Sequence, residues 1–217
     1  MFDLKRYSSN IQMILGPHEG GNRLMPLAPA EPLRGPGLAL LTAASARQLL
    51  ADEKIASEEF VNCVRSALFL YFSDLQASHE VSQSVHSSTG SFLHGIMHRQ
   101  EPDFGNAKYW FRRVVDHAVY EDLRQASVAL LKAQSSPAAK LLAGEIESSS
   151  SWDPQWLIDQ CEAAQGGNNA DFEQRLLEIQ RLEWQLLFDY CYCKATGKTN
   201  ILPAAAISAT SIDRSKA

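Results

Sequence analysis

The sequence lacks an apolar run long enough to cross a membrane. Its most apolar stretches, such as residues 67–72, fall far short of the roughly 20 residues that a membrane-spanning helix needs. Residues 1–6 also lack the order of positive charge, apolar run and small-residue cleavage site that a secretory signal has. We therefore expect a protein that spans no membrane and works in the cytoplasm. Ser215-Lys216-Ala217 approaches the peroxisomal signal Ser-Lys-Leu without its leucine.

An excess of positive charge is also missing. The chain of 217 residues carries 20 Lys and Arg against 25 Asp and Glu, which gives a formal net charge of −5. Binding to a nucleic-acid backbone depends on a basic field that neutralises phosphates. The composition therefore argues against a nucleic-acid partner and favours a protein, a peptide or a small anionic molecule.

Cysteine is scarce, and the motifs of several enzyme classes are absent. Four cysteines do not form a disulfide framework in a chain of this size, so we expect them to be small buried hydrophobes. Cys191 and Cys193 lie two apart on a predicted helix, which points their side chains about 200° apart and disfavours a shared metal. The sequence has no Gly-x-Ser-x-Gly, no His-Glu-x-x-His and no Glu-x-x-His of the di-iron kind.

Glycine and proline are concentrated near the N-terminus. Ten of them fall between Gly16 and Gly37, a density that neither a helix nor a central strand tolerates. From Leu38 to Lys194, apolar residues recur at three- and four-residue steps, the period of helices. The sequence therefore predicts an irregular arm over residues 1–37, a single all-helical domain over 38–197 and a flexible tail over 198–217.

Capping residues and breakers place the helices coarsely. Ser57, Asp103 and Asp153 each precede an amphipathic stretch as N-cap residues do, and Pro154 occupies the first helical position after Asp153. Gly197 marks the end of the last helix. The predicted helices span residues 58–72, 75–85, 91–100, 104–115, 119–133, 137–147, 154–164 and 172–195.

Two stretches 29 residues apart, 73–78 and 102–107, have the same design. Each follows one helix and begins another with an Asp, an apolar residue and then a small residue. In the second hairpin, Gly95, Ala107 and Phe111 have the spacing of the small, small and aromatic packing positions of the tetratricopeptide repeat, which they resemble in part. The predicted architecture is therefore a compact stack of antiparallel helical hairpins, similar to tetratricopeptide proteins.

Residues 94–114, HGIMHRQEPDFGNAKYWFRRV, also resemble the hallmark of a family of small, uncharacterised, all-helical proteins. The likeness extends more weakly over residues 66–123 and 152–191. It implies a helical fold and a site near this string, and it implies no chemistry.

Histidine is clustered, and this is the strongest functional signal. Five of the six histidines lie within 39 residues: His79, His86, His94, His98 and His117. His94 and His98 are four apart on a predicted helix, so both imidazoles lie on one face and could hold one metal ion. His79 or Glu101 is the candidate for a third ligand. Alternatively, these histidines are ordinary core or surface groups.

A metal-free site is a further alternative. His94 or His98 would then act as a general base, and Arg99, Arg112 or Arg113 would hold a carboxylate or phosphate. The predicted groove is lined by His79, His94, His98, Arg99, Asn106, Tyr109, Arg112 and Arg113.

Two hypotheses follow for the function. The first is a protein whose groove binds a partner peptide or a small anionic ligand. The second is a small helical enzyme with His94, His98 and Glu101 as catalytic candidates, either with a divalent metal as its cofactor or with a histidine as general base and no metal. Asp103 is expected to be a helix cap, Glu183 to pair with Arg99 or Arg112, and Trp110 to belong to the core. The charge pairs near residues 99–113 would also suit a homodimer contact.

Overall fold

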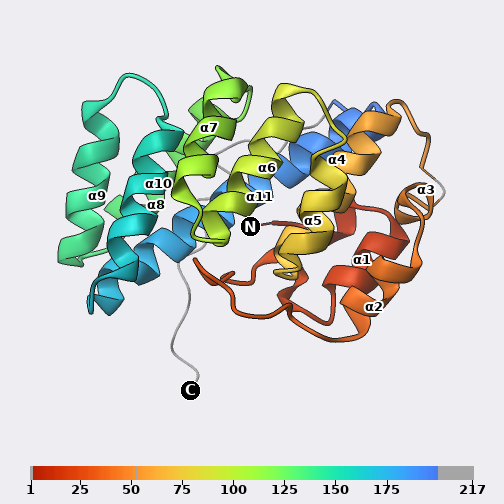
Figure 1. Cartoon of the computed structure of the whole chain (residues 1–217), viewed down its shortest axis with the longest axis horizontal. Coiled ribbons are helices and arrows are strands. Elements are labelled where there is room, and N and C mark those ends of the chain that lie inside the picture. The colour runs from red at the N-terminus through yellow and green to blue at the C-terminus, as the bar shows by residue number, and fades with distance from the viewer. Residues whose placement is uncertain (1, 52, 200–217) are drawn as a thin grey trace.

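The computed structural model describes residues 2–51 and 53–199, and over these residues the protein is all-helical, as predicted (Figure 1). The C-terminal residues 200–217, which include Ser215-Lys216-Ala217 and most of the expected tail, lie outside the described residues. No described helix is long and apolar enough to cross a membrane. The described elements are two short 3-10 helices, η1 (Leu4–Arg6) and η2 (Glu19–Gly21), and eleven α-helices: α1 (Ser9–Leu15), α2 (Pro36–Ala43), α3 (Ala46–Leu49), α4 (Glu58–Tyr71), α5 (Leu75–Ser82), α6 (Ser88–Gln100), α7 (Phe104–Val114), α8 (Tyr120–Lys132), α9 (Pro137–Ser148), α10 (Pro154–Gln165) and α11 (Ala170–Thr196).

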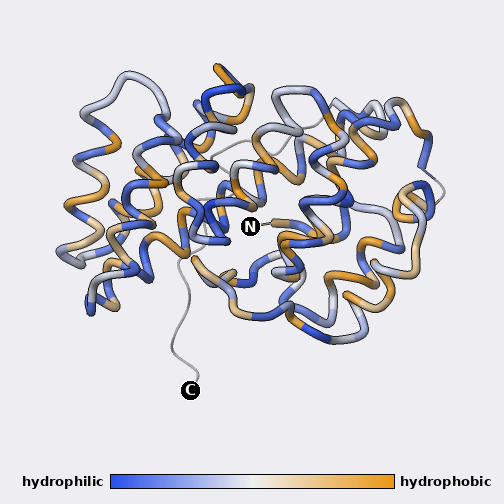
Figure 2. The backbone as a smooth tube through the Cα atoms, viewed as in Figure 1, coloured by the Kyte–Doolittle hydropathy of each residue, from blue (hydrophilic) through white to orange (hydrophobic). Residues whose placement is uncertain are grey.

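Consecutive helices pack as hairpins. α4 pairs with α5, α6 with α7, and α8 with α9, and in Figure 1 these hairpins follow one another across the molecule. The long helix α11 runs behind them and packs against α4, α8, α9 and α10. Hydrophobic and hydrophilic segments alternate along most helices (Figure 2), as expected for helices with one face on a shared core.

The predicted caps are present. The side chains of Ser57, Asp103 and Asp153 each accept a hydrogen bond from a backbone N–H in the first turn of the following helix. Gly197 ends α11 in the left-handed conformation, with φ of 77°. Two boundaries differ by three residues: α5 ends at Ser82 rather than Val85, and α6 begins at Ser88 rather than Ser91. The polar residues before Ser91 belong to α6 because the Ser87 side chain caps the helix by accepting from the N–H of Gly90 at 3.3 Å.

The N-terminal segment, expected to be irregular throughout, contains helix α1. Ser8 caps this helix, and Ile11, Ile14 and Leu15 are buried at helical spacing. Between η2 and α2 the backbone is irregular, as the glycines and prolines require. Side chains of α11 supply hydrogen bonds to the backbone of this irregular segment. Gln185 donates to the carbonyl of Gly21 and Gln180 to that of Met25, both at 2.8 Å.

The core is centred on the contact between α4 and α11. Trp184 of α11 is buried, and its indole N–H donates to the carbonyl of Ala67 in α4 at 2.7 Å. In the α6–α7 hairpin, a Cβ atom at Gly95 would lie 2.7 Å from the ring of Phe111, so the aromatic ring fills the space that the glycine leaves. This is the close approach that the spacing of these two residues predicts, while the likeness to tetratricopeptide repeats stays a prediction.

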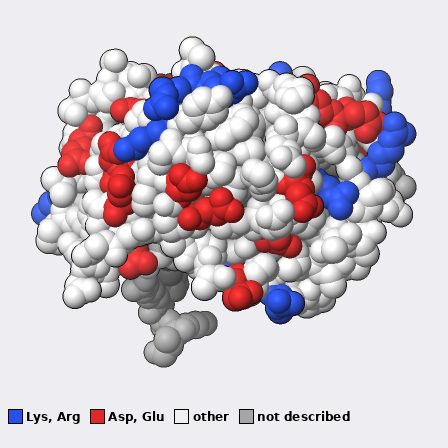
Figure 3. Space-filling model, viewed as in Figure 1, with Lys and Arg blue, Asp and Glu red and all other residues white. Residues whose placement is uncertain are grey.

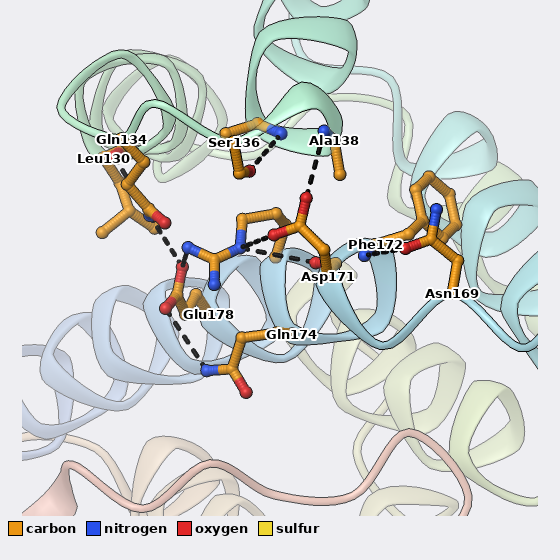
Figure 4. Close-up of polar contacts among 11 residues, drawn as sticks. Leu130, Gln134, Ser136, Ala138, Asn169, Asp171, Phe172, Gln174 and Glu178 are labelled. Carbon is orange, nitrogen blue, oxygen red and sulfur yellow. Dashed lines mark hydrogen bonds and ion pairs between the residues drawn. The ribbon is translucent and has the colours of Figure 1, made fainter.

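The third hairpin is attached to α11 by polar contacts (Figure 4). The carboxylate of Glu178 accepts hydrogen bonds from Gln134, which follows the end of α8, at 2.9 Å and from Gln174 at 3.3 Å. Asp171 accepts from the N–H of Ala138, in the first turn of α9, at 3.2 Å. The carboxylates thus satisfy donors at the connection between α8 and α9 and hold it against α11.

Candidate functional site

Three of the predicted site residues meet in one cluster. His79 comes from α5, and His94 and His98 lie four apart on α6. The ring centroid of His94 is 4.7 Å from that of His79 and 4.9 Å from that of His98, and His79 and His98 are 5.8 Å apart. One possible ligand atom from each residue lies within 4.8 Å of the other two. Among the described residues, this group of His, Cys, Asp or Glu is the one able to hold a metal ion.

A buried serine lies against Nδ1 of His94. Ser82, in the last turn of α5, donates its hydroxyl hydrogen to the backbone carbonyl of His79 at 3.4 Å. The same oxygen lies 3.2 Å from Nδ1 of His94. The hydroxyl group has one hydrogen, and when that hydrogen points to the carbonyl, the oxygen accepts from the imidazole. In that arrangement His94 carries its proton on Nδ1, and the lone pair on Nε2 is available to a ligand.

A carboxylate lies against the corresponding nitrogen, Nδ1, of His98. Glu101 Oε2 lies 3.2 Å from Nδ1 of His98, and Asp103 Oδ2 lies 4.0 Å from the same atom. The alignment is poor for a hydrogen bond, so the carboxylates act on His98 mainly through their negative charge. Negative charge beside Nδ1 favours a proton on that nitrogen, which leaves Nε2 of His98 as the donor atom.

The protein environment keeps two of the imidazoles neutral. Burial, together with the neighbouring His98 and His79, lowers the pKa of His94 to about 4. Burial also lowers the pKa of His98, although Glu101 and Asp103 act in the opposite direction. Neutral imidazoles are the form that binds metal ions, so at neutral pH no proton has to leave these two residues.

Trp110 forms one wall of the cluster. Its ring lies 4.0 Å from that of His94, centroid to centroid, at an angle of 31°. The guanidinium carbon of Arg113 lies 5.3 Å from the centroid of the Trp110 ring and 5.8 Å from that of Tyr109. The sequence predicts Trp110 as a core residue, but its side chain is only partly buried and packs on His94 instead.

Sequence reasoning missed the contributions of Trp110 and Ser82. Ser82 could have been found by its position, since it lies three residues after His79 and so on the same helical face. Trp110 carried no such signal, because only the packing of α7 on α6 brings it to His94.

Other predicted site residues lie elsewhere. Arg99, expected to line the groove, is completely buried and forms an ion pair with Glu183 through both carboxylate oxygens, while Gln180 accepts from it at 3.4 Å. This confirms the prediction of a partner for Glu183, and it corrects the role of Arg99, which a buried carboxylate has drawn into the core. The side chain of Asn106 donates to Asp103 at 2.6 Å, which keeps it at the start of α7.

Two histidines of the clustered stretch do not join the site. His86 is exposed. His117 is buried, with Nε2 3.0 Å from the hydroxyl of Thr89, and Nδ1 accepts from the N–H of Val119 at 3.4 Å. Both nitrogens of His117 thus have partners in the core, which is the ordinary role of a buried histidine.

Opposite charges lie at the two ends of the α6–α7 hairpin. Glu101 and Asp103 belong to its turn, and Arg112 and Arg113 are exposed at the end of α7. Figure 3 shows Lys and Arg side chains gathered over the upper end of this hairpin and acidic side chains below it. The histidine cluster therefore lies in a field that runs from negative at the turn to positive at the end of α7.

Comparisons with protein-family models, with curated proteins and with solved structures found no match to this chain. The function is therefore argued from the site alone.

Proposed function

We propose that this protein binds one divalent transition-metal ion, such as Zn²⁺, through His79, His94 and His98, and that it is a metal-dependent enzyme. The observation that carries the proposal is the convergence of three imidazoles whose ligand atoms lie within 4.8 Å of one another. Nitrogen atoms that share a tetrahedral Zn²⁺ at about 2.0–2.1 Å lie roughly 3.4 Å apart. The rings therefore need to move together by only about an ångström, which rotation of the side chains supplies.

The contacts of the Nδ1 atoms of His94 and His98 support the same proposal. Histidines that bind metals usually give their other N–H to a carboxylate, a carbonyl or a water, which fixes the ring. Here the hydroxyl oxygen of Ser82 lies 3.2 Å from Nδ1 of His94, and Glu101 lies against Nδ1 of His98. With a proton on each Nδ1, both Nε2 atoms would be available to an ion.

The number of ligands favours catalysis over a structural role. Structural zinc sites close with four protein ligands, whereas catalytic sites have three and keep a position for water or substrate. The described cluster has three members, and it reaches the surface at His79, which is only partly buried. The ion would supply a Lewis acid that polarises a bound oxygen.

Metal analysis of the purified protein tests this proposal. We expect one Zn²⁺ or Co²⁺ per chain by elemental analysis and by calorimetric titration of the chelator-treated protein. His79→Ala, which changes the most accessible ligand, should weaken binding by about 100-fold or more while the circular dichroism spectrum stays helical. His86→Ala, a change of an exposed histidine outside the cluster, is the matched control. Equal affinity in the two variants would refute the proposal.

A second candidate function is binding of a partner peptide or small anion without a metal. The observation in its favour is the exposed edge of α7, where Tyr109 is 46% exposed beside Arg112 and Arg113. Large aromatic and arginine side chains are common in binding surfaces. This function predicts that a chelator leaves ligand affinity unchanged, whereas the metal-dependent function predicts that it abolishes activity.

A further inference from the structure

The side chain of Arg113 is held close to the histidine cluster without an acidic partner. Its guanidinium group lies over the rings of Trp110 and Tyr109, and it donates to the hydroxyl of Tyr109 at 3.4 Å. No carboxylate of the described residues forms an ion pair with it. Aromatic faces attract a guanidinium group but leave its positive charge in place. Arg113 is therefore an oriented cation whose charge is not neutralised.

The distance between Arg113 and the cluster is limited by Trp110. The indole ring lies 4.0 Å from the His94 ring and 5.3 Å from the guanidinium carbon of Arg113. The guanidinium carbon is therefore at most about 9.3 Å from the centroid of the His94 ring. A ligand atom on the proposed metal ion and a charged group on Arg113 would be separated by the length of a short carbon chain, with Trp110 as the apolar surface between them.

The surrounding charges select the sign of the ligand. Glu101 and Asp103 lie beside Nδ1 of His98, on the side of the ring away from the proposed ion. At the other end of the hairpin, Arg112 and Arg113 are exposed (Figure 3). An anionic group would be attracted to this end of α7 and repelled from the turn.

We propose that the ligand of the metal site is a small organic acid with two oxygen-bearing ends, an inference that rests on the proposed metal-dependent function. One end is a carboxylate that forms a two-pronged pair with Arg113, and the other end reaches the fourth position on the ion. A single guanidinium group matches the charge and planarity of one carboxylate. Arg99 has no part in this recognition, because it is buried against Glu183.

The visible absorption spectrum of the Co²⁺-loaded protein provides the test. The probes are glutarate, with two carboxylates, acetate, with one, and 5-aminopentanoate, in which an amine replaces the distal carboxylate. We expect glutarate to change the spectrum with an affinity at least 10-fold higher than acetate, and 5-aminopentanoate to bind no better than acetate. Arg113→Gln should reduce the affinity for glutarate to that for acetate, with Co²⁺ binding unchanged.

Arg112→Gln is the matched control, because Arg112 is the neighbouring exposed arginine and has no described contact with Trp110 or Tyr109. This variant should retain at least half of the preference for glutarate. Equal affinities for glutarate and acetate, or a preference that survives Arg113→Gln, would overturn this inference and leave the metal site intact. Failure to observe any Co²⁺ spectrum would instead overturn the proposed function.

Discussion

The indole ring of Trp110 lies against the imidazole of His94, with 4.0 Å between their centroids. An aromatic ring in contact with a metal ligand should report on the metal. We expect Cu²⁺ to quench part of the tryptophan fluorescence of the protein, because the ion would be bound by the ring that Trp110 touches. Trp110→Phe should remove this quenchable part, while emission from Trp152, Trp156 and Trp184 persists. Quenching of the same size in this variant would show that the ion binds elsewhere.

Ser82 should matter for metal affinity although it touches no ion. Loss of a group that orients a ligand typically weakens metal binding by about 10–100-fold, and we expect this range for Ser82→Ala. Ser84→Ala is a suitable control, because the Ser84 hydroxyl is exposed and donates only to the carbonyl of Val81 at 2.8 Å. Calorimetric titration with Zn²⁺ measures the metal affinity of both variants. Equal affinities in the two variants would remove Ser82 from the site.

Acid should destabilise the metal-free protein through its buried histidines. Burial lowers the pKa of His117 to about 4, while an unfolded histidine has a pKa near 6.5. Between these two pH values the unfolded chain binds more protons than the folded protein. The stability of the folded protein that depends on neutral His117 is therefore fully present above about pH 6.5 and is lost as the pH falls toward 4.

Urea unfolding at pH 7 and pH 5 measures this loss. We expect His117→Gln to reduce the difference in unfolding free energy between the two pH values by on the order of 1–2 kcal/mol. His86→Gln, at an exposed position, should leave it unchanged. An unaltered difference in the His117 variant would show that this histidine does not cause the loss of stability in acid.

The buried pair of Arg99 and Glu183 should be sensitive to the loss of one partner. Glu183→Gln leaves a guanidinium charge in the core, and removal of one member of a buried pair costs about 3–5 kcal/mol. Replacing both residues, as in Arg99→Met with Glu183→Leu, should restore most of the stability because no charge stays buried. A double variant less stable than the single one in thermal unfolding would argue against this account.

Two glycines on helices provide a matched pair. Gly95→Ala should destabilise the protein by about 1–3 kcal/mol, because the added Cβ would lie 2.7 Å from the Phe111 ring. Gly144→Ala, in α9, meets no atom within 4 Å and should be neutral or stabilise the helix by up to about 1 kcal/mol. Equal melting temperatures in the two variants would contradict the close packing of α6 on α7.

The sequence alone determined the helical class and most helix boundaries. The residues that begin and end the helices act on the backbone within a few residues, so the helix ends can be predicted without a tertiary structure. They are Ser57, Asp103, Asp153 and Gly197. The spacing of His94 and His98 is local in the same sense, because any helix places residues four apart on one face. Helix α1 was missed because the many glycines and prolines that follow it hid a short amphipathic stretch.

Only the tertiary structure decided which residues share a site. His79 joins His94 because α5 packs on α6, and Trp110 joins them because α7 packs on the other side. Arg99 lies next to His98 in the sequence but points into the core, where Glu183, 84 residues away, needs a positive partner. Contacts between distant segments depend on how whole helix faces fit together, and no local pattern in the sequence carries that information.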